Sequence, residues 1–342
     1  MTGHTGFKGV WLVLWLHRLS AHVTGFALDP DDADESLFAR TRAHEVLESI
    51  TGDVRDLHSV VSVFERSRPE IVFHLAAQAL VRRSYEDPVG TIATNVMGTA
   101  NVLEAARRTP SVRAVIVVTS DKSYANEVPA RPRRETDPMG GADPYSASKG
   151  CAELITGAYR RSFFESGEKL VATARAGNVI GLGDTSVDRI VPDIVRSIVG
   201  GDTIAVRNPT SVRPWQHVLE PLRGYLTLGS RLLEGDHRFA EAWNFGPDAA
   251  DAIQVQELVR RIVTEWGTGT VVHRPDPGAP HEAPVLTLDI AKARSRLGFE
   301  PALNLDDAVR LTVTGYKKLI DGSPPARDIV GRQLEEYMEL LR

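Results

Sequence analysis

Two short stretches of the chain carry side chains that could move protons, and one of them holds a tyrosine and a lysine. Tyr145 and Lys149 are four residues apart, so on a helix they would share one face. A nearby ammonium group is expected to lower the tyrosine pKa from its usual value of about 10. The phenolate would then be available as a base near neutral pH, which suits the removal of a hydroxyl proton during hydride transfer.

The other stretch is Ser120-Asp121-Lys122, which directly follows a predicted strand at 114–119. The Ser120 hydroxyl could therefore reach the same cleft and bind a reacting oxygen. Hydride transfer alone would need neither Asp121 nor Lys122. The elimination of water needs an acid and a base, because one group removes a proton while another protonates the departing hydroxyl. The pair therefore favours a dehydration, with a surface ion pair in a loop as the alternative interpretation.

Glycines at the start of the chain predict a dinucleotide site. Gly3, Gly6 and Gly9 precede an apolar helical pattern, and glycines let the backbone approach a pyrophosphate at a helix N-terminus. Asp29 lies 20 residues after Gly9 at the end of the next predicted strand, where a carboxylate accepts hydrogen bonds from an adenosine ribose. Because a carboxylate there would repel a 2′-phosphate, we predict NAD and not NADP as the cofactor.

Further cofactor contacts are predicted at the ends of two other strands. Asp53 and Val54 could hold the adenine, and the small residues after Leu75 would let the backbone lie close to the cofactor. The predicted cofactor contacts are Gly3, Thr5, Gly6, Phe7, Gly9, Asp29, Asp53, Val54, Leu75, Ala76, Ala77, Gln78, Asn95, Tyr145 and Lys149.

The elements that must position these residues alternate between strands and helices. β-branched runs predict strands at 23–28, 71–75, 114–119 and 170–174, and apolar periodicity predicts helices at 10–19, 91–107 and 145–164. This alternation is typical of an α/β protein with a doubly wound parallel sheet, a Rossmann fold. Ligands of such folds bind beyond the carboxyl ends of the strands, where Asp29 and Ser120 are expected.

The second half of the chain predicts a smaller C-terminal lobe, because glycines and prolines interrupt shorter helical patterns there. We predict an NAD-binding domain over 1–177, to which 213–247 returns, and a substrate lobe over 178–212 and 248–342. Only two residues precede Gly3, so the first strand of the sheet looks absent from this sequence. Losing a central strand would leave two unpaired edges, and we expect the natural chain to begin further upstream. The alternative is a fragment that does not fold while its longer parent is active.

Composition excludes several function classes. A formal charge of −5 leaves no excess of cations for nucleic acid, and no metal site is predicted. The apolar run at 10–16 is too short to span a membrane, and a signal peptide is a weaker explanation of it than the helix after the glycine loop. Cys151 is the only cysteine, which favours a reducing compartment. We therefore expect a cytoplasmic protein.

Longer motifs resemble those of CDP-glucose 4,6-dehydratases, which belong to the extended short-chain dehydrogenase class. The resemblance covers nearly the whole chain. Its motifs lie at 2–9 (Thr-Gly-His-Thr-Gly-Phe-Lys-Gly), 119–124 (Thr-Ser-Asp-Lys-Ser-Tyr), 137–149, 175–181, 213–221 and 244–247. The Asp121-Lys122 pair is the discriminating detail, because the related dTDP-glucose dehydratases carry Asp-Glu at this place.

The resemblance implies conversion of CDP-glucose to CDP-4-keto-6-deoxyglucose with NAD that is never released. Tyr145, aided by Lys149 and Ser120, would take the proton of the C4 hydroxyl while the C4 hydride passes to NAD. Lys122 would remove the C5 proton, Asp121 would protonate the leaving C6 hydroxyl, and the hydride would return to C6. This division of roles is a hypothesis. It requires a partly neutral lysine and a partly protonated carboxyl, which burial and, for Lys122, the nearby Lys149 would favour.

The resemblance also implies substrate contacts and an oligomer. Asn178 would lie near the diphosphate or sugar, Arg189 and Arg213 would bind phosphates, and His281 with Glu282 would border the nucleotide. The helices at 91–107 and 145–164 would pair across a two-fold axis in a homodimer or a dimer of dimers.

Three alternative functions stay open. A nucleotide-sugar 4-epimerase would share NAD, Tyr145 and Lys149, but it would not need Asp121 and Lys122. A dehydratase for another nucleotide sugar is the second, because only the resemblance points to cytosine. A non-catalytic NAD-binding regulator is the third, although Ser120, Tyr145 and Lys149 are all present.

Overall fold

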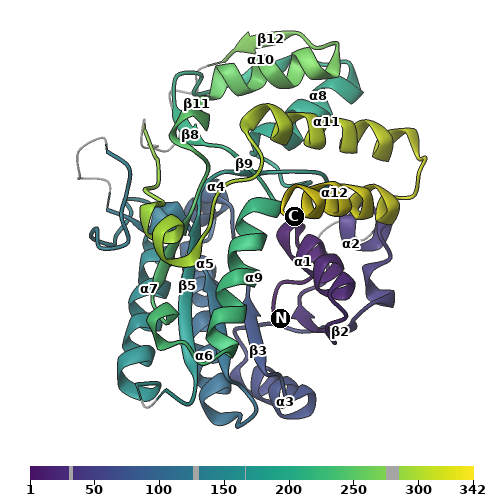
Figure 1. Ribbon diagram of the computed structural model, residues 1–342. Helices are drawn as coiled ribbons and strands as arrows, with labels where there is room; N and C mark the ends of the chain where they lie inside the picture. The colour runs from purple at the N-terminus through teal and green to yellow at the C-terminus, as the bar shows by residue number, and fades with distance from the viewer. Residues whose placement is uncertain (31–33, 126–130, 166, 275–284) are drawn as a thin grey trace.

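The computed structural model of the chain describes residues 1–30, 34–125, 131–165, 167–274 and 285–342 (Figure 1). Its main sheet is parallel, as predicted. The strands are β1 (Thr24–Ala27), β2 (Glu48–Thr51), β3 (Ile71–His74), β4 (Ala114–Val118), β5 (Leu170–Ala176) and β10 (Ala242–Phe245). Hydrogen bonds join β1 to β2 and link the other four in the order β3, β4, β5, β10.

The first residues of the chain fill the position between β1 and β3. Thr2 forms parallel bridges with Phe26 and His74. The backbone N–H of Thr2 donates to the carbonyl of Phe73 at 2.9 Å, and that of Gly3 donates to the carbonyl of Phe26 at 3.0 Å. The expectation that this strand is absent was therefore too strong, because its last residues are present and join the two parts of the sheet.

Helices cover both faces of the sheet, which explains why every side chain of β4 and β5 is buried. Successive strand residues point to opposite faces, so Ile116 packs in one core while Val115 and Val117 pack in the other. One face carries α1 (Phe7–Arg18) and α9 (Leu219–Leu233), with α12 (Ala326–Leu340) packed on α1, and the other carries α3 (Leu57–Ser67), α6 (Gly98–Arg108) and α7 (Pro144–Phe163).

The remaining elements form short connections and a second layer above the sheet (Figure 1). The connections on the sheet side are α2 (Leu37–Arg40), α4 (Val81–Glu86), α5 (Pro88–Ile92) and the π-helix Ala93–Met97. The upper elements are β6 (Val179–Ile180), α8 (Ile190–Gly200), β7 (Ile204–Val206), β8 (Val212–Pro214), β9 (Gln216–His217), β11 (Ala252–Gln254), α10 (Val255–Trp266), β12 (Val271–His273) and α11 (Leu305–Asp321).

Small two-stranded pairings hold the upper elements together. β7 pairs with β12 in parallel, β8 pairs with β11 in antiparallel, and β6 pairs with β9 in parallel. Between them, the chain returns to the main sheet through α9 and β10, which packs beside β5. Within the described parts of the chain, no helix combines the length and the apolarity that a membrane span requires.

Candidate active site

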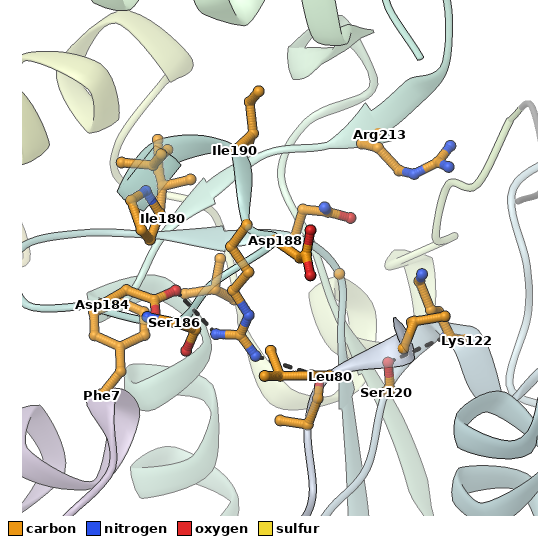
Figure 2. Close-up of a pocket in the computed structure, with 18 of the residues that line it drawn as sticks. Phe7, Leu80, Ser120, Lys122, Ile180, Asp184, Ser186, Asp188, Ile190 and Arg213 are labelled. Atoms are coloured by element: carbon orange, nitrogen blue, oxygen red, sulfur yellow. Dashed lines mark hydrogen bonds and ion pairs between the residues drawn. The ribbon is translucent and has the colours of Figure 1, made fainter. Parts of the chain in front are cut away.

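A cavity of about 490 Å³ opens where the carboxyl ends of the strands face the upper elements (Figure 2). Residues just after β3, β4 and β5 form one part of its wall, and residues around α8, β7 and β8 form another. Fourteen of the predicted site residues line it: Gly3, Gly6, Phe7, Gly9, Leu75, Ala77, Ser120, Asp121, Lys122, Tyr145, Lys149, Asn178, Arg189 and Arg213.

The glycine loop is packed so tightly that two of its glycines have no room for a side chain. A Cβ on Gly3 would lie 2.6 Å from the backbone nitrogen of Ala76, and Gly3 also has a φ of +73°. A Cβ on Gly9 would lie 2.0 Å from the carbonyl oxygen of Gly3. Gly6 differs, because the nearest protein atom to its Cβ would be 3.6 Å away. Gly6 is also the N-cap of α1, where no side chain caps the helix, so the N-terminal N–H groups suit an anion.

The predicted adenosine contacts lie at the strand ends next to this loop, outside the cavity wall. The Thr5 hydroxyl donates to the carbonyl of Leu28 at 2.9 Å, and Asp29 accepts a hydrogen bond from the Thr51 hydroxyl at 2.8 Å. The Asp53 carboxylate is bound to the Arg55 guanidinium at 2.5 Å, and this hydrogen bond lowers its pKa.

Asn95 does not line the cavity, but it stabilises the cofactor side of the site through hydrogen bonds. Its side-chain oxygen accepts from the backbone N–H of Gln78 at 2.9 Å, and its amide donates to the carbonyl of Gln78 at 2.9 Å and to the Ser148 hydroxyl at 2.8 Å. These bonds use both N–H donors of a buried side chain. Asn95 therefore joins the loop after β3 to α7, beside Lys149.

Ser120 and Asp121 form a tight turn at the end of β4. The Ser120 hydroxyl accepts from the backbone N–H of Lys122 at 3.2 Å and donates to Asp121 Oδ1 at 3.0 Å. Asp121 Oδ2 is buried and has no hydrogen-bond partner among the described residues. Burial raises the pKa of Asp121, while Lys122, Ser120 and Arg213 oppose the change. A carboxyl in this environment is suited to donate a proton.

Tyr145 and Lys149 project from the first turns of α7, which Asp143 caps by accepting from the backbone N–H of Ser146 at 2.9 Å. Burial raises the pKa of Tyr145, and the hydrogen bond with Ser120 and the charge of Arg189 oppose this. The prediction of a lowered tyrosine pKa is therefore wrong for this arrangement, because burial has the larger effect. Lys149 Nζ lies 3.3 Å from the carbonyl oxygen of Val118, and burial lowers the pKa of this lysine to about 8.

The predicted phosphate ligands lie on the wall opposite the strand ends. Arg189 donates to Asp184 at 2.9 Å, and its charge acts on Tyr145. Arg213 acts on Asp121 in the same way, and Figure 2 shows Arg213 and Lys122 on the same side of the cavity. Asn178 lies between β5 and β6 and also lines the cavity. His281 and Glu282 lie outside the described residues.

Comparison with known proteins identifies the family. The family model for GDP-mannose 4,6 dehydratase matches residues 1–312. The chain belongs to this family. It is 46% identical to a CDP-glucose 4,6-dehydratase of Salmonella typhimurium (strain LT2), over 99% of this chain and 95% of the relative.

Solved structures confirm the fold. A dTDP-glucose 4,6-dehydratase of Streptomyces venezuelae, with NAD and TYD bound, superposes with a TM-score of 0.80 at 23% identity, over 95% of this chain and 98% of that one. A UDP-glucuronic acid 4-epimerase of Bacillus cereus, in complex with UDP-glucuronic acid and NAD, gives a TM-score of 0.80 at 20% identity, over 93% and 98%. The predicted Rossmann architecture is therefore confirmed.

Within this family member, the cavity contains charged residues that sequence reasoning missed. Lys8 belongs to the first turn of α1, and burial together with the charges of Arg189 and Lys149 lowers its pKa to about 8. Asp184 binds Arg189, and Arg207 lies near the end of β7. Lys8 could have been noticed, since it stands inside the glycine motif. For Asp184 and Arg207 the sequence offered no comparable signal.

Proposed function

We propose that this chain is a nucleotide-sugar 4,6-dehydratase that converts CDP-glucose to CDP-4-keto-6-deoxyglucose with bound NAD. One observation carries the proposal: the Tyr145 and Lys149 pair shares a single cavity with Asp121 and Lys122. The first pair suits oxidation at C4, and the second suits elimination across C5 and C6. The 46% identity to a CDP-glucose 4,6-dehydratase supports the same reaction and nucleotide. A 4-epimerase would leave the second pair without a role.

The residues of the glycine loop fit NAD. Gly3 and Gly9 keep the loop closed against β3 and α1, while Gly6 leaves the space that a pyrophosphate needs. Asp29 would bind the adenosine ribose and disfavour a 2′-phosphate. When bound, NAD supplies a hydride acceptor whose nicotinamide ring carries a positive charge.

Oxidation at C4 depends on Tyr145, Ser120 and Lys149. Tyr145 would take the proton of the C4 hydroxyl, while Ser120, which is hydrogen-bonded to the phenol, would hold the same sugar oxygen. Because burial favours the neutral phenol, the phenolate needs cations around it. The protein supplies Lys149 from α7 and Arg189 from the opposite wall.

Elimination of water depends on Asp121 and Lys122. The ketone at C4 acidifies C5, and Lys122 would take the C5 proton. The C6–oxygen bond then breaks, and Asp121 would protonate the leaving hydroxyl so that water departs and a C5–C6 double bond forms. The hydride removed from C4 would return to C6 and a proton would return to C5, which gives the 6-deoxy sugar with no net change of the cofactor. The buried, unpartnered Oδ2 of Asp121 and its raised pKa support this role, because they favour a protonated carboxyl.

We also propose the location of the substrate and the state of the protein. Arg189 and Arg213 would bind the diphosphate, with Asn178 and His281 nearby. The substrate lobe would comprise 178–212 and 248–342, while 1–177 and 213–247 bind NAD.

Apolar side chains exposed on α5, the π-helix and α7 support a homodimer, or a dimer of dimers, through these helices: Val89, Ile92, Met97, Leu154 and Phe163. We place the protein in the cytoplasm, because its single cysteine is typical of a reducing compartment.

The test uses the purified protein with CDP-glucose and catalytic NAD, followed by the alkali-induced absorbance of a 4-keto-6-deoxy sugar. UDP-glucose, dTDP-glucose and GDP-mannose serve as competing substrates. Product from CDP-glucose without net formation of reduced cofactor supports the proposal. A 4-epimer of the sugar without any keto product would refute it in favour of the epimerase.

A further inference from the structure

The cavity has a far end that the proposed chemistry leaves without a role. It is lined by Val206 at the end of β7, by Arg207, Asn208 and Ser211 after that strand, and by Val255 at the start of α10. Backbone bonds hold this segment in place, since the N–H of Val255 donates to the carbonyl of Ser211 at 2.9 Å and that of Gln256 donates to the carbonyl of Pro209 at 2.9 Å. A ligand at this end would therefore meet a fixed wall.

This end adjoins the predicted phosphate ligands, because Arg207 pairs with Asp188, the residue before Arg189. The charge of Arg189 acts on Tyr145, and that of Arg213 acts on Asp121, so both arginines are near the reacting sugar. Arg207 lies on the same wall as Arg189, where it pairs at 2.5 Å with Asp188, the residue before Arg189, and its charge acts on Asp193 of α8. A nucleotide sugar with its glucose at Tyr145 and its diphosphate at the two arginines would carry its base to this end.

Arg207 is held there by one residue in an unusual conformation. Its guanidinium donates to the Asp188 carboxylate at 2.5 Å and to the Asp188 carbonyl at 3.4 Å. Asp188 has a φ of +62°, a left-handed conformation that few residues other than glycine adopt. Figure 2 shows Asp188 in the middle of the cavity-lining side chains, between Arg213 and Asp184 in this view. No other hydrogen bond of Arg207 occurs within the described residues, so its remaining N–H groups are available to a ligand.

We propose that Arg207, oriented by Asp188, recognises cytosine and so determines the base specificity of the enzyme; this inference rests on the proposed function. Arginine offers only donors. Cytosine presents two adjacent acceptors, O2 and N3, which match such a fork. Uracil and thymine carry a hydrogen on N3, so at this position an N–H group of the arginine would face the N3–H group of the base, and neither could accept a hydrogen bond. A site built for one hydrogen-bonding pattern rejects a base that leaves its polar groups unpaired.

The experiment measures binding of CDP, UDP, dTDP and GDP by isothermal titration calorimetry. We compare wild type with Arg207→Gln, whose amide can turn to satisfy either pyrimidine, and with Arg207→Lys, which keeps the charge but loses the fork. Asp188→Asn removes the anchoring charge while asparagine tolerates the left-handed backbone. Arg260→Lys, on the exposed face of α10, is the matched control. Thermal unfolding of each variant shows whether the protein folds.

We expect wild type to prefer CDP over UDP and dTDP, and Arg207→Gln to reduce that ratio by roughly ten- to a hundredfold, as loss of one bidentate base contact does. Arg207→Lys and Asp188→Asn should reduce it too, so either serves if Arg207→Gln does not fold. Equal weakening of all four nucleotides by Arg207→Gln, with rescue by Arg207→Lys, would assign Arg207 to the phosphates and overturn the inference. Preference for GDP, or no preference, in wild type would overturn it as well.

Binding and turnover separate the two proposals. A wild-type protein that prefers CDP through Arg207 but makes no keto sugar would refute the dehydratase and leave the base assignment standing. A protein that converts CDP-glucose while Arg207→Gln keeps the wild-type CDP to UDP ratio would refute the base assignment alone.

Discussion

Replacing Glu153 by glutamine tests whether a buried ion pair behind the active site holds the catalytic turn in place. Glu153 lies on α7, one helical turn after Lys149, and pairs with Arg175 of β5 at 2.8 Å with only 4% of either side chain exposed. Its carboxylate also accepts from the Thr173 hydroxyl at 2.7 Å and from the hydroxyl of Thr119, the residue before Ser120. The pair thus joins α7, β5 and the end of β4.

The expected cost follows from what glutamine leaves unpaired. Arg175 donates to both carboxylate oxygens, from Nε at 2.8 Å and from Nη2 at 2.8 Å, and glutamine retains only one acceptor. Removing one partner of a buried pair costs about 3–5 kcal/mol, because it leaves an uncompensated buried charge. That is a large part of a total stability of about 5–15 kcal/mol.

The pH dependence of this cost has a definite sign. Burial opposes the ionised form of Glu153, but the charge and hydrogen bonds of Arg175 outweigh it, so the folded-state pKa is lowered. A carboxyl with a lowered pKa contributes stability above its unfolded value of about 4.3, and it loses that contribution as the pH falls. The difference between wild type and Glu153→Gln should therefore be full at neutral pH and shrink in acid.

Urea unfolding followed by tryptophan fluorescence measures the difference, with Glu257→Gln as the control. Glu257 also binds two arginines, Arg260 at 2.7 Å and Arg261 at 2.9 Å, but it does so at the surface of α10. An exposed pair contributes about 0–1 kcal/mol. Equal and small effects of the two substitutions would refute the claim that burial makes the Glu153 pair structurally important.

Three further predictions concern the reaction and the cofactor. Asp121→Asn should slow formation of the keto-deoxy sugar by roughly 10²- to 10⁴-fold while reduced nicotinamide builds up in the near ultraviolet, and a rate close to wild type would exclude Asp121 as the acid. The kcat/KM of wild type, which reports groups of the substrate-free enzyme, should fall as the pH rises through about 8, where Lys149 loses its proton, and a Lys149→Arg variant, which stays charged, should lack this fall in its pH profile. Gly6→Ala should weaken NAD binding in calorimetry without lowering the melting temperature, whereas Gly9→Ala should lower both, because its Cβ would lie 2.0 Å from the Gly3 carbonyl oxygen.

The fold was predictable because its signals are local. The runs at 71–75 and 114–119 became β3 and β4, and the helix expected at 145–164 became α7. The first strand was misjudged for a physical reason: two residues suffice to bridge β1 and β3 when backbone bonds reach both neighbours. Sequence periodicity requires a longer run than that.

The candidate site was predictable only in part. Ser120 and Tyr145 stand in motifs at the end of a strand and the start of a helix, so their convergence followed from the fold. The position of Arg207 depends on the left-handed backbone of Asp188, which no local pattern indicates. The pKa of Tyr145 depends on its burial, a property of the whole packed cavity.

The same burial acts on other ionisable groups around the cavity. A chain with a net charge of −5 gathers Lys8, Lys149, Arg189 and Arg213 around one cavity. Burial lowers the pKa of Lys8 and Lys149 and raises that of Asp121, so it shifts these two lysines and this carboxyl toward their neutral forms. A dianionic diphosphate would oppose this by restoring charge to the lysines. Substrate binding would therefore favour charged Lys149 when Tyr145 must become a phenolate.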